Sequence, residues 1–192
     1  MSITLVTGPS RSGKSEWAEQ LAANCAERNS QQVVYVATAK ISPDDAEWRS
    51  RIKQHQLRRP TTWQVEEVPT ALEGAILLQR ERIDTFSSPC ASHCLLIDSL
   101  GTWLANLIEQ DDDSWQEIQQ SLVNALMQTD ADVILVAEET GWGVVPAYQL
   151  GRRFRDRLGT LSRTIGQIST DVYLVASGYA INLKQLGTPV GQ

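Results

Sequence analysis

Short runs of consecutive apolar residues recur along the chain and predict buried β-strands. Continuous apolar runs are typical of parallel strands covered on both faces, whereas strands with one solvated face alternate apolar and polar residues. Helical stretches separate the runs, so the pattern predicts an α/β fold built on a mostly parallel sheet with helices on both faces. The runs cover residues 3–7, 33–37, 94–98, 133–137 and 172–176.

Other segments follow different periods. Residues 62–68 alternate, which predicts an edge strand, and residues 146–168 carry apolar residues three and four apart, which predicts a helix with one buried stripe. We also expect a helix from Ser99 to about Glu109, then an acidic loop at residues 111–113, and an exposed loop at residues 84–93. The stripe consists of Leu150, Phe154, Leu158, Leu161, Ile165 and Ile168.

An octet after the first apolar run matches G-x-x-x-x-G-K-[ST], the pattern of a phosphate-binding loop. A helix is expected directly after it, at residues 16–23. Glycines let successive backbone N–H groups turn toward phosphates, and the helix N-terminus adds partial positive charge. In such loops the lysine reaches the outer phosphates and the final hydroxyl ligates Mg²⁺. The octet is Gly8, Pro9, Ser10, Arg11, Ser12, Gly13, Lys14 and Ser15.

Asp98 ends the apolar run at residues 94–98. Parallel α/β sheets bind their ligands at the carboxyl ends of strands, where nucleotide-binding proteins of this class place an acid on the Mg²⁺ side. The alternative is that Asp98 caps the following helix. Because the phosphate loop is present, we favour the role beside Mg²⁺, with Ser15 and Asp98 as the metal-side residues.

A basic cluster lies at residues 49–60, where five cationic residues surround His55. Such a cluster would favour triphosphate binding and would stabilise charge that develops on phosphorus. The alternative is a solvated helix face with an ordinary surface histidine. The residue chemistry alone favours that alternative, because charge runs are usually solvated.

Composition narrows the classes of function. The 192 residues carry a net charge of −6 and are 42% hydrophobic, which predicts one globular domain over residues 1–192 and disfavours nucleic acid as a partner. No apolar stretch approaches the roughly 20 residues that a membrane span needs, and the first strand leaves no room for a signal peptide. The three cysteines show no disulfide spacing, so we expect a cytoplasmic protein.

Further motifs follow the phosphate loop in a fixed order and span nearly the whole chain. The most specific are Arg51-Ile52-x-x-His55-x-x-x-Arg59-Pro60-x-x-Trp63 and Glu139-x-Gly141-x-Gly143-x-Val145-Pro146. In this combination the chain resembles the bifunctional adenosylcobinamide kinase/adenosylcobinamide-phosphate guanylyltransferase family of cobalamin biosynthesis. The other matching segments are residues 35–39, 98–100, 103–107 and 175–178.

The resemblance implies a fold, two reactions and an assembly. The fold is that of a RecA-like P-loop NTPase, and the family is oligomeric, commonly trimeric. In the first reaction, ATP or GTP phosphorylates the aminopropanol arm of adenosylcobinamide. In the second, GTP donates GMP to that phosphate through a guanylyl-histidine, giving adenosylcobinamide-GDP and pyrophosphate. A neutral imidazole offers a free ring nitrogen for such covalent catalysis.

The resemblance also assigns residues to roles. His55 stands at the position of the guanylylated histidine, and the octet from Gly8 to Ser15 stands among the positions that contact GTP. The chain departs from the family pattern at Gly101, where a larger residue is usual, and at Glu138, which lies in Ala137-Glu138-Glu139 where the family has Ser-Asn-Glu. The remaining GTP-contacting positions are Thr38, Ala39, Lys40, Gln56, Leu57, Arg58, Arg59, Glu67 and Asp98.

Two other classes of function remain as alternatives. A monofunctional small-molecule kinase would use the same phosphate loop without a covalent histidine. A nucleotide-switch module would bind a partner in a nucleotide-dependent way and hydrolyse the nucleotide only slowly. The short acidic chain argues against the switch module, because it carries no appended partner domain.

Overall fold

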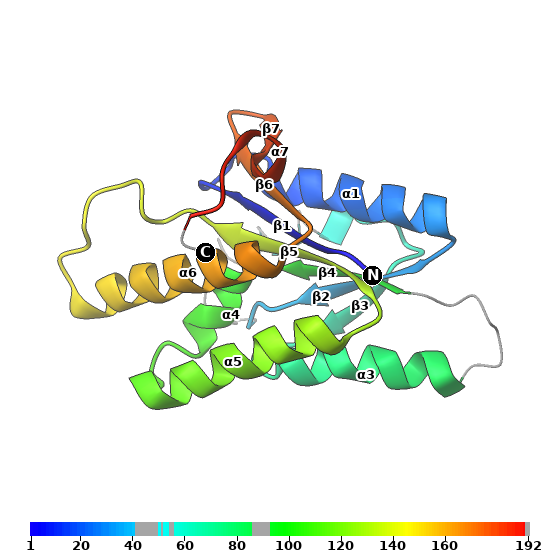
Figure 1. Ribbon diagram of the computed structural model, residues 1–192, viewed down its shortest axis with the longest axis horizontal. Coiled ribbons are helices and arrows are strands. Elements are labelled where there is room, and N and C mark those ends of the chain that lie inside the picture. Colours follow the sequence, from blue (N-terminus) through cyan, green and yellow to red (C-terminus); the bar gives the residue numbers. More distant parts are fainter. Residues whose placement is uncertain (41–49, 51, 54–55, 86–92, 191–192) are drawn as a thin grey trace.

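The computed structural model describes residues 1–40, 50, 52–53, 56–85 and 93–190. Within these residues seven strands form one sheet in the order β3-β2-β4-β5-β1-β6-β7 (Figure 1). The predicted buried strands are confirmed, and so is the edge strand, because β3 ends the sheet. The strands are β1 (Ile3–Gly8), β2 (Gln32–Ala37), β3 (Gln64–Glu67), β4 (His93–Asp98), β5 (Asp132–Glu138), β6 (Asp171–Ala176) and β7 (Tyr179–Asn182).

The direction of the strands decides where functional side chains meet. Strands β1 to β6 pair in parallel, and β7 pairs antiparallel with β6. Strand β1 lies between β5 and β6, and its last residue, Gly8, is in register with Glu138. The register also aligns Ala37 with Asp98 at the end of β2 and β4. The carboxyl ends of these strands therefore form one edge of the sheet.

Helices cover both faces of the sheet, as predicted. On one face α1 packs against β1, β2, β4 and β5, while α3, α4, α5 and α6 bury a larger apolar cluster on the other (Figure 1). Within the described residues, no helix combines the length and the apolar character that crossing a bilayer requires. The helices are α1 (Lys14–Asn29), α3 (Leu72–Thr85), α4 (Leu100–Asn106), α5 (Asp112–Gln128), α6 (Gln149–Ile168) and α7 (Leu183–Leu186).

Three local expectations differ from the structure. The acidic segment 111–113 is not a loop: Asp111 caps α5 by accepting a hydrogen bond from the Ser114 N–H, and acidic residues in a first turn favour the helix dipole. The helix expected from Ser99 to Glu109 ends at Asn106. Leu150 is 47% exposed, because the first turn of α6 projects past the sheet edge (Figure 1). The expected loop 84–93 has helical residues up to Thr85, and residues 86–92 lie outside the described part.

Arg157 joins α6 to the connection between α4 and α5. Its side chain is only 6% exposed, and its guanidinium donates to the Gln110 carbonyl at 2.8 Å and to the Asp112 carboxylate at 2.7 Å. The guanidinium also lies 5.4 Å from the centre of the Trp115 ring. A buried cation needs partners of this kind, because desolvation would otherwise make its burial costly.

We expect Arg157→Ala to lower the free energy of unfolding by about 3 kcal/mol, since it removes the buried cation and leaves carbonyl oxygens without their donor. Urea unfolding followed by circular dichroism measures the change. Arg155→Ala is the matched control, because Arg155 lies on the same helix and forms an ion pair with its exposed neighbour Asp156. Its loss should stay below about 1 kcal/mol. Equal losses in the two variants would contradict a special role for Arg157.

Candidate active site

The phosphate loop connects β1 to α1 in the conformation that its sequence requires. Arg11 and Gly13 adopt left-handed backbone angles, with φ of 58° and 94°. Gly8 must lack a side chain, because a Cβ there would lie 2.2 Å from the Val175 carbonyl oxygen. Alternating backbone conformations of this kind turn N–H groups into an anion-binding concavity, and the unpaired N–H groups of the first turn of α1 adjoin it.

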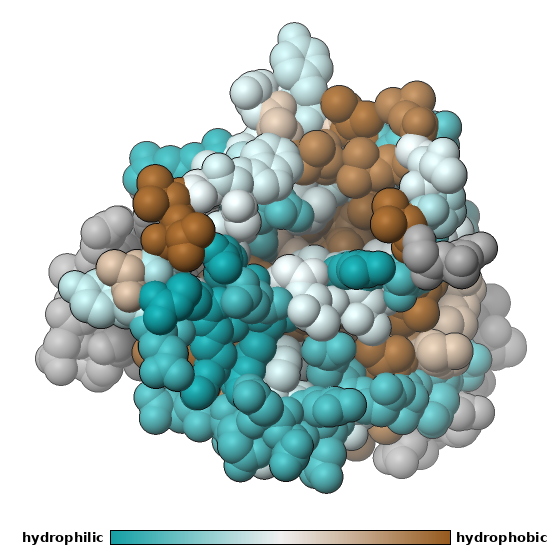
Figure 2. Space-filling view, turned by 60° about the vertical axis from the view of Figure 1, so that its left-hand side comes forward, coloured by the Kyte–Doolittle hydropathy of each residue, from teal (hydrophilic) through white to brown (hydrophobic). Residues whose placement is uncertain are grey.

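A cavity of about 580 Å³ opens over this loop at the carboxyl edge of the sheet. Figure 2 brings this edge forward and shows a hollow near the centre of the face, with hydrophilic side chains gathered below it. The volume is in the range of sites that bind small molecules. Among the described residues, the lining consists of Ser10, Arg11, Ser12, Gly13, Lys14, Ser15, Glu16, Tyr35, Ala37, Ala39, Ile52, Arg58, Arg59, Asp98, Ser99, Thr102 and Glu138.

Asp98 lies directly across the cavity from the end of the phosphate loop. Its carboxylate accepts a hydrogen bond from the Ser15 hydroxyl at 3.5 Å and another from the Tyr35 hydroxyl at 2.9 Å. Burial raises the pKa of Tyr35, and the neighbouring Asp98 carboxylate raises it further, so this hydroxyl stays a donor. The expected helix cap is Ser99 rather than Asp98, since the Ser99 side chain accepts from the Thr102 N–H.

The turn after Asp98 is held by buried hydrogen bonds. Thr38 is fully buried, and its hydroxyl donates to the Ser99 carbonyl at 2.8 Å and accepts from the Ser99 N–H at 2.9 Å. The Ser99 hydroxyl in turn donates to Glu138 at 2.6 Å. Each of these groups would cost free energy if it were buried without a partner, so together they fix the position of Asp98.

Two arginines supply positive charge to the cavity wall. The Arg59 guanidinium lies 3.4 Å from the centre of the Tyr35 ring, in a cation–π arrangement. Arg58 forms ion pairs with Glu16 and Glu19 on α1. Both arginines line the cavity, so this part of the basic cluster is not merely a solvated helix face. Guanidinium groups suit this place because they bind phosphate oxygens through fixed pairs of N–H donors.

The two departures from the family pattern contact each other. The Glu138 carboxylate accepts a hydrogen bond from the Gly101 N–H at 3.0 Å. A Cβ at residue 101 would lie 2.0 Å from the same carboxylate oxygen, so glycine makes room for this glutamate. Burial raises the pKa of Glu138, and nearby Asp98 raises it too, while the Ser99 hydrogen bond and Lys14 oppose the rise.

The structure brings together many, but not all, of the residues that the sequence assigned to nucleotide binding. Ser10 to Ser15, Ala39, Arg58, Arg59 and Asp98 line the cavity. Gly8 lies beneath the loop, the Pro9 carbonyl accepts from Lys14 at 3.4 Å, and Thr38 supports Ser99. Lys40 lines a neighbouring cavity.

The remaining assigned residues lie elsewhere or are not described. Gln56 and Leu57 are exposed, and Glu67 is exposed at the end of β3. His55 lies outside the described residues, so its assignment stays a prediction, as does each assigned contact with GTP.

Sequence reasoning overlooked several residues of the cavity wall. Glu138 ends an apolar strand in the same way that Asp98 does, so the argument that found Asp98 would also have found Glu138. Tyr35 lies within an apolar strand, where a tyrosine is indistinguishable from an ordinary core residue. Ser99 and Thr102 are revealed only by their hydrogen bonds at the start of α4.

The cavity offers oxygen ligands suited to a hard cation such as Mg²⁺. Ser15 and Asp98 present their oxygens side by side. No group of three or more His, Cys, Asp and Glu side chains able to hold a metal occurs among the described residues. This arrangement fits Mg²⁺, because Mg²⁺ is usually held by one or two protein groups together with waters and substrate phosphates.

Comparison with solved structures identifies the fold. The ATPase domain of a protein of known structure superposes with a TM-score of 0.54 over 90% of this chain and 68% of that chain, at 14% sequence identity. This likeness, together with the parallel sheet and the phosphate loop, confirms the predicted RecA-like P-loop NTPase fold.

Comparison of sequences identifies the family. The bifunctional adenosylcobalamin biosynthesis protein CobP of Pseudomonas aeruginosa is 36% identical over 181 residues, which cover 94% of this chain and 96% of that protein. The protein CobU of Escherichia coli, which has the same description, is 34% identical over 95% of this chain and 99% of that protein. The family model for cobinamide kinase / cobinamide phosphate guanyltransferase matches residues 4–183. The chain therefore belongs to the cobinamide kinase / cobinamide phosphate guanyltransferase family.

Proposed function

We propose that the chain phosphorylates adenosylcobinamide with ATP or GTP and then transfers GMP from GTP to adenosylcobinamide phosphate. One observation supports this proposal above all: the phosphate loop, Asp98 and two arginines line a single cavity in a chain of this family. The enzyme is a transferase that belongs to cobalamin biosynthesis. A homotrimer and a cytoplasmic location stay predictions.

In this proposal the phosphate loop holds the triphosphate. Backbone N–H groups of residues 10–13 and the start of α1 face the phosphate oxygens, and Lys14 leaves the Pro9 carbonyl to bind the outer phosphates. Ser15 and Asp98 hold Mg²⁺, which neutralises charge on the phosphates when it is bound. Tyr35 orients Asp98 through its hydrogen bond.

The guanylyl transfer proceeds through His55 in two displacements. A ring nitrogen of His55 attacks the α-phosphorus of GTP, a P–N bond forms, and pyrophosphate leaves with the electrons of the broken P–O bond. A phosphate oxygen of adenosylcobinamide phosphate then attacks the same phosphorus and releases the histidine. The proposal is supported by the chain position of His55, three and four residues before Arg58 and Arg59, which line the cavity and stabilise negative charge.

We expect GTP with Mg²⁺ to stabilise the fold by about 2.7 kcal/mol when it is present at about 100 times its dissociation constant. Lys14→Ala should remove most of the corresponding shift in a thermal melt, because the cation that faces the phosphates is lost. Lys184→Ala is the matched control, since Lys184 lies on α7 and contacts the Gln167 carbonyl away from the cavity. A GTP-dependent shift that is unchanged in Lys14→Ala would remove the loop from the binding site.

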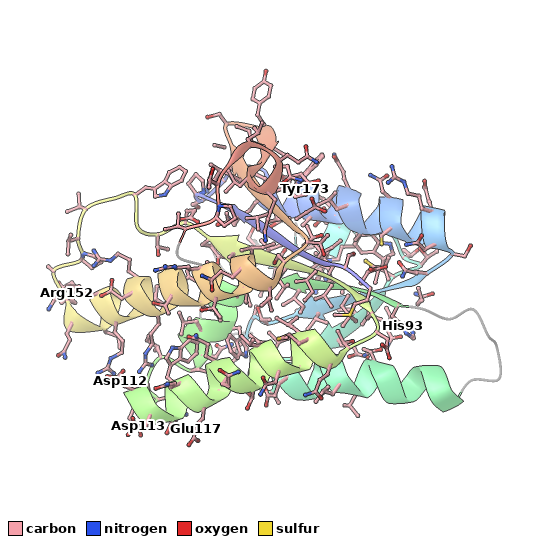
Figure 3. All side chains as sticks on the ribbon, in the orientation of Figure 1. His93, Asp112, Asp113, Glu117, Arg152 and Tyr173 are labelled. Atoms are coloured by element: carbon pink, nitrogen blue, oxygen red, sulfur yellow. The ribbon has the colours of Figure 1, made fainter. Side chains whose placement is uncertain are left out.

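Asp98→Asn should lower both phosphoryl and guanylyl transfer by roughly 10- to 100-fold and should raise the Mg²⁺ concentration needed for half-maximal rate. The amide keeps the shape of the side chain but loses the charge that attracts the cation. Initial rates measured across a Mg²⁺ titration test this expectation. Asp113→Asn, on the outer side of α5, should change neither rate (Figure 3). Wild-type Mg²⁺ dependence in Asp98→Asn would show that Asp98 holds no metal.

GTP labelled on its α-phosphate should leave label on the protein, whereas GTP labelled on its γ-phosphate should not form this adduct. The linkage should be acid-labile and alkali-stable, as a P–N bond is. His55→Ala should lose the label and the guanylyl transfer, because the nucleophile is absent. Its phosphoryl transfer should persist, because that step relies on positioning and charge.

His93→Gln is the control for this experiment, because His93 is the other of the two histidines in the chain. It begins β4, at the end of that strand opposite Asp98 (Figure 3). This variant should label like the wild type. Label retained by His55→Ala would refute the assignment, and a wild type that transfers phosphoryl groups without α-label would favour a monofunctional kinase.

A further inference from the structure

A second cavity, of about 370 Å³, adjoins the nucleotide cavity. The two cavities share Glu138 and Thr102, so they meet at these side chains. The second cavity has an apolar part formed by Ala105 and Phe154, and its volume suits a small group rather than a whole corrinoid. A molecule that enters it therefore meets the phosphate-binding side of the nucleotide cavity at Glu138.

Glu138 differs chemically from the other residues around the second cavity. Among the described residues that line it, Glu138 is the only carboxylate; the other polar side chains are Lys40, Thr102, Asn106 and Thr140. A cation, two hydroxyls and an amide are poor proton acceptors at neutral pH. The Asn106 amide already donates to the carbonyls of Thr38 and Pro69, at 2.8 and 2.9 Å.

The Glu138 carboxylate is held in one orientation. One oxygen accepts from the Ser99 hydroxyl at 2.6 Å, and the other accepts from the Gly101 N–H at 3.0 Å. Each carboxylate oxygen has two lone-pair directions, so each keeps capacity for a further donor. The charged groups that face this carboxylate are Lys14, which attracts it, and Asp98, which repels it. Lys14 belongs to the phosphate loop, which places Glu138 close to where a terminal phosphate would bind.

We propose that the second cavity binds the hydroxyl-bearing arm of the acceptor and that Glu138 is the general base of the phosphoryl transfer. This inference rests on the proposed function. The hydroxyl oxygen attacks the γ-phosphorus and an O–P bond forms. The bond from the γ-phosphorus to the bridging oxygen breaks, the nucleoside diphosphate leaves with the electron pair, and the hydroxyl proton passes to Glu138. Guanylyl transfer needs no such base, because its acceptor is a phosphate that is already ionised.

The experiment compares both transfers in one protein preparation. Glu138→Gln keeps the size of the side chain, and its amide can still accept from the Gly101 N–H and donate to the Ser99 hydroxyl. Its rate of phosphoryl transfer from ATP to adenosylcobinamide should fall by about 100-fold or more, the usual contribution of a general base. Its guanylyl transfer to supplied adenosylcobinamide phosphate should stay within about threefold of the wild type. That second rate also reports that the nucleotide site is folded.

Two further variants approach the site independently. Gly101→Ala adds a methyl group where the Glu138 carboxylate lies, so it should displace the carboxylate and lower phosphoryl transfer selectively. Ala105→Leu fills part of the second cavity from an exposed helix position, so it should raise the KM for adenosylcobinamide and leave the KM for ATP unchanged. Glu117→Gln, on the outer side of α5, is the matched control and should retain both rates (Figure 3).

The possible outcomes separate this inference from the proposed function. A selective loss of phosphoryl transfer in Glu138→Gln supports the assignment. Full phosphoryl transfer in that variant, or an equal loss of both transfers, would overturn it while the proposed function stands. An unchanged KM for adenosylcobinamide in Ala105→Leu would overturn the acceptor cavity. A wild-type protein that transfers no phosphoryl group would overturn the proposed function, and this inference with it.

Discussion

The parallel register of β1, β4 and β5 is the constraint on which the active site depends. Backbone hydrogen bonds align Gly8 with Glu138, and Asp98 with Val136, so the three strands end at one edge of the sheet. A shift of one residue would turn each strand-end side chain toward the opposite face, because side chains alternate along a strand. The apolar clusters on both faces resist such a shift. The core therefore fixes the distances between groups that act on one substrate.

Buried polar groups extend this constraint from the strands to the turn that follows β4. Thr38, Ser99 and Glu138 satisfy one another in a short chain of hydrogen bonds beneath the cavity. In a largely buried place, each bond is more costly to lose than it is stabilising to make. The chain of bonds links the ends of β2, β4 and β5, so the position of Asp98 depends on residues that need not touch a nucleotide. Active sites commonly require a supporting shell of this kind.

The sequence predicted the parts of the fold that have a periodic signal. The buried strands, the edge strand and most of α6 follow from runs of apolar residues, and the phosphate loop follows from a fixed spacing. Helix α5 was missed because its three aspartates read as a loop, although Asp111 is a good N-cap. Glu138 and Gly101 were noticed only as departures from a pattern. Their contact depends on how closely α4 approaches β5, and no local property of the sequence encodes that distance.

One cavity can support two transfers because the transfers share some requirements and differ in others. Both need a triphosphate held by the loop, and both develop charge that Lys14, Arg58 and Arg59 can stabilise. They differ in the phosphorus attacked and in whether the attacking group must lose a proton. A hydroxyl needs a base beside the γ-phosphate, whereas an imidazole or a phosphate already carries a free electron pair. A shared loop with a separate group for each attack therefore lets one P-loop fold perform both reactions, and a carboxylate at the end of β5 meets the first of these needs.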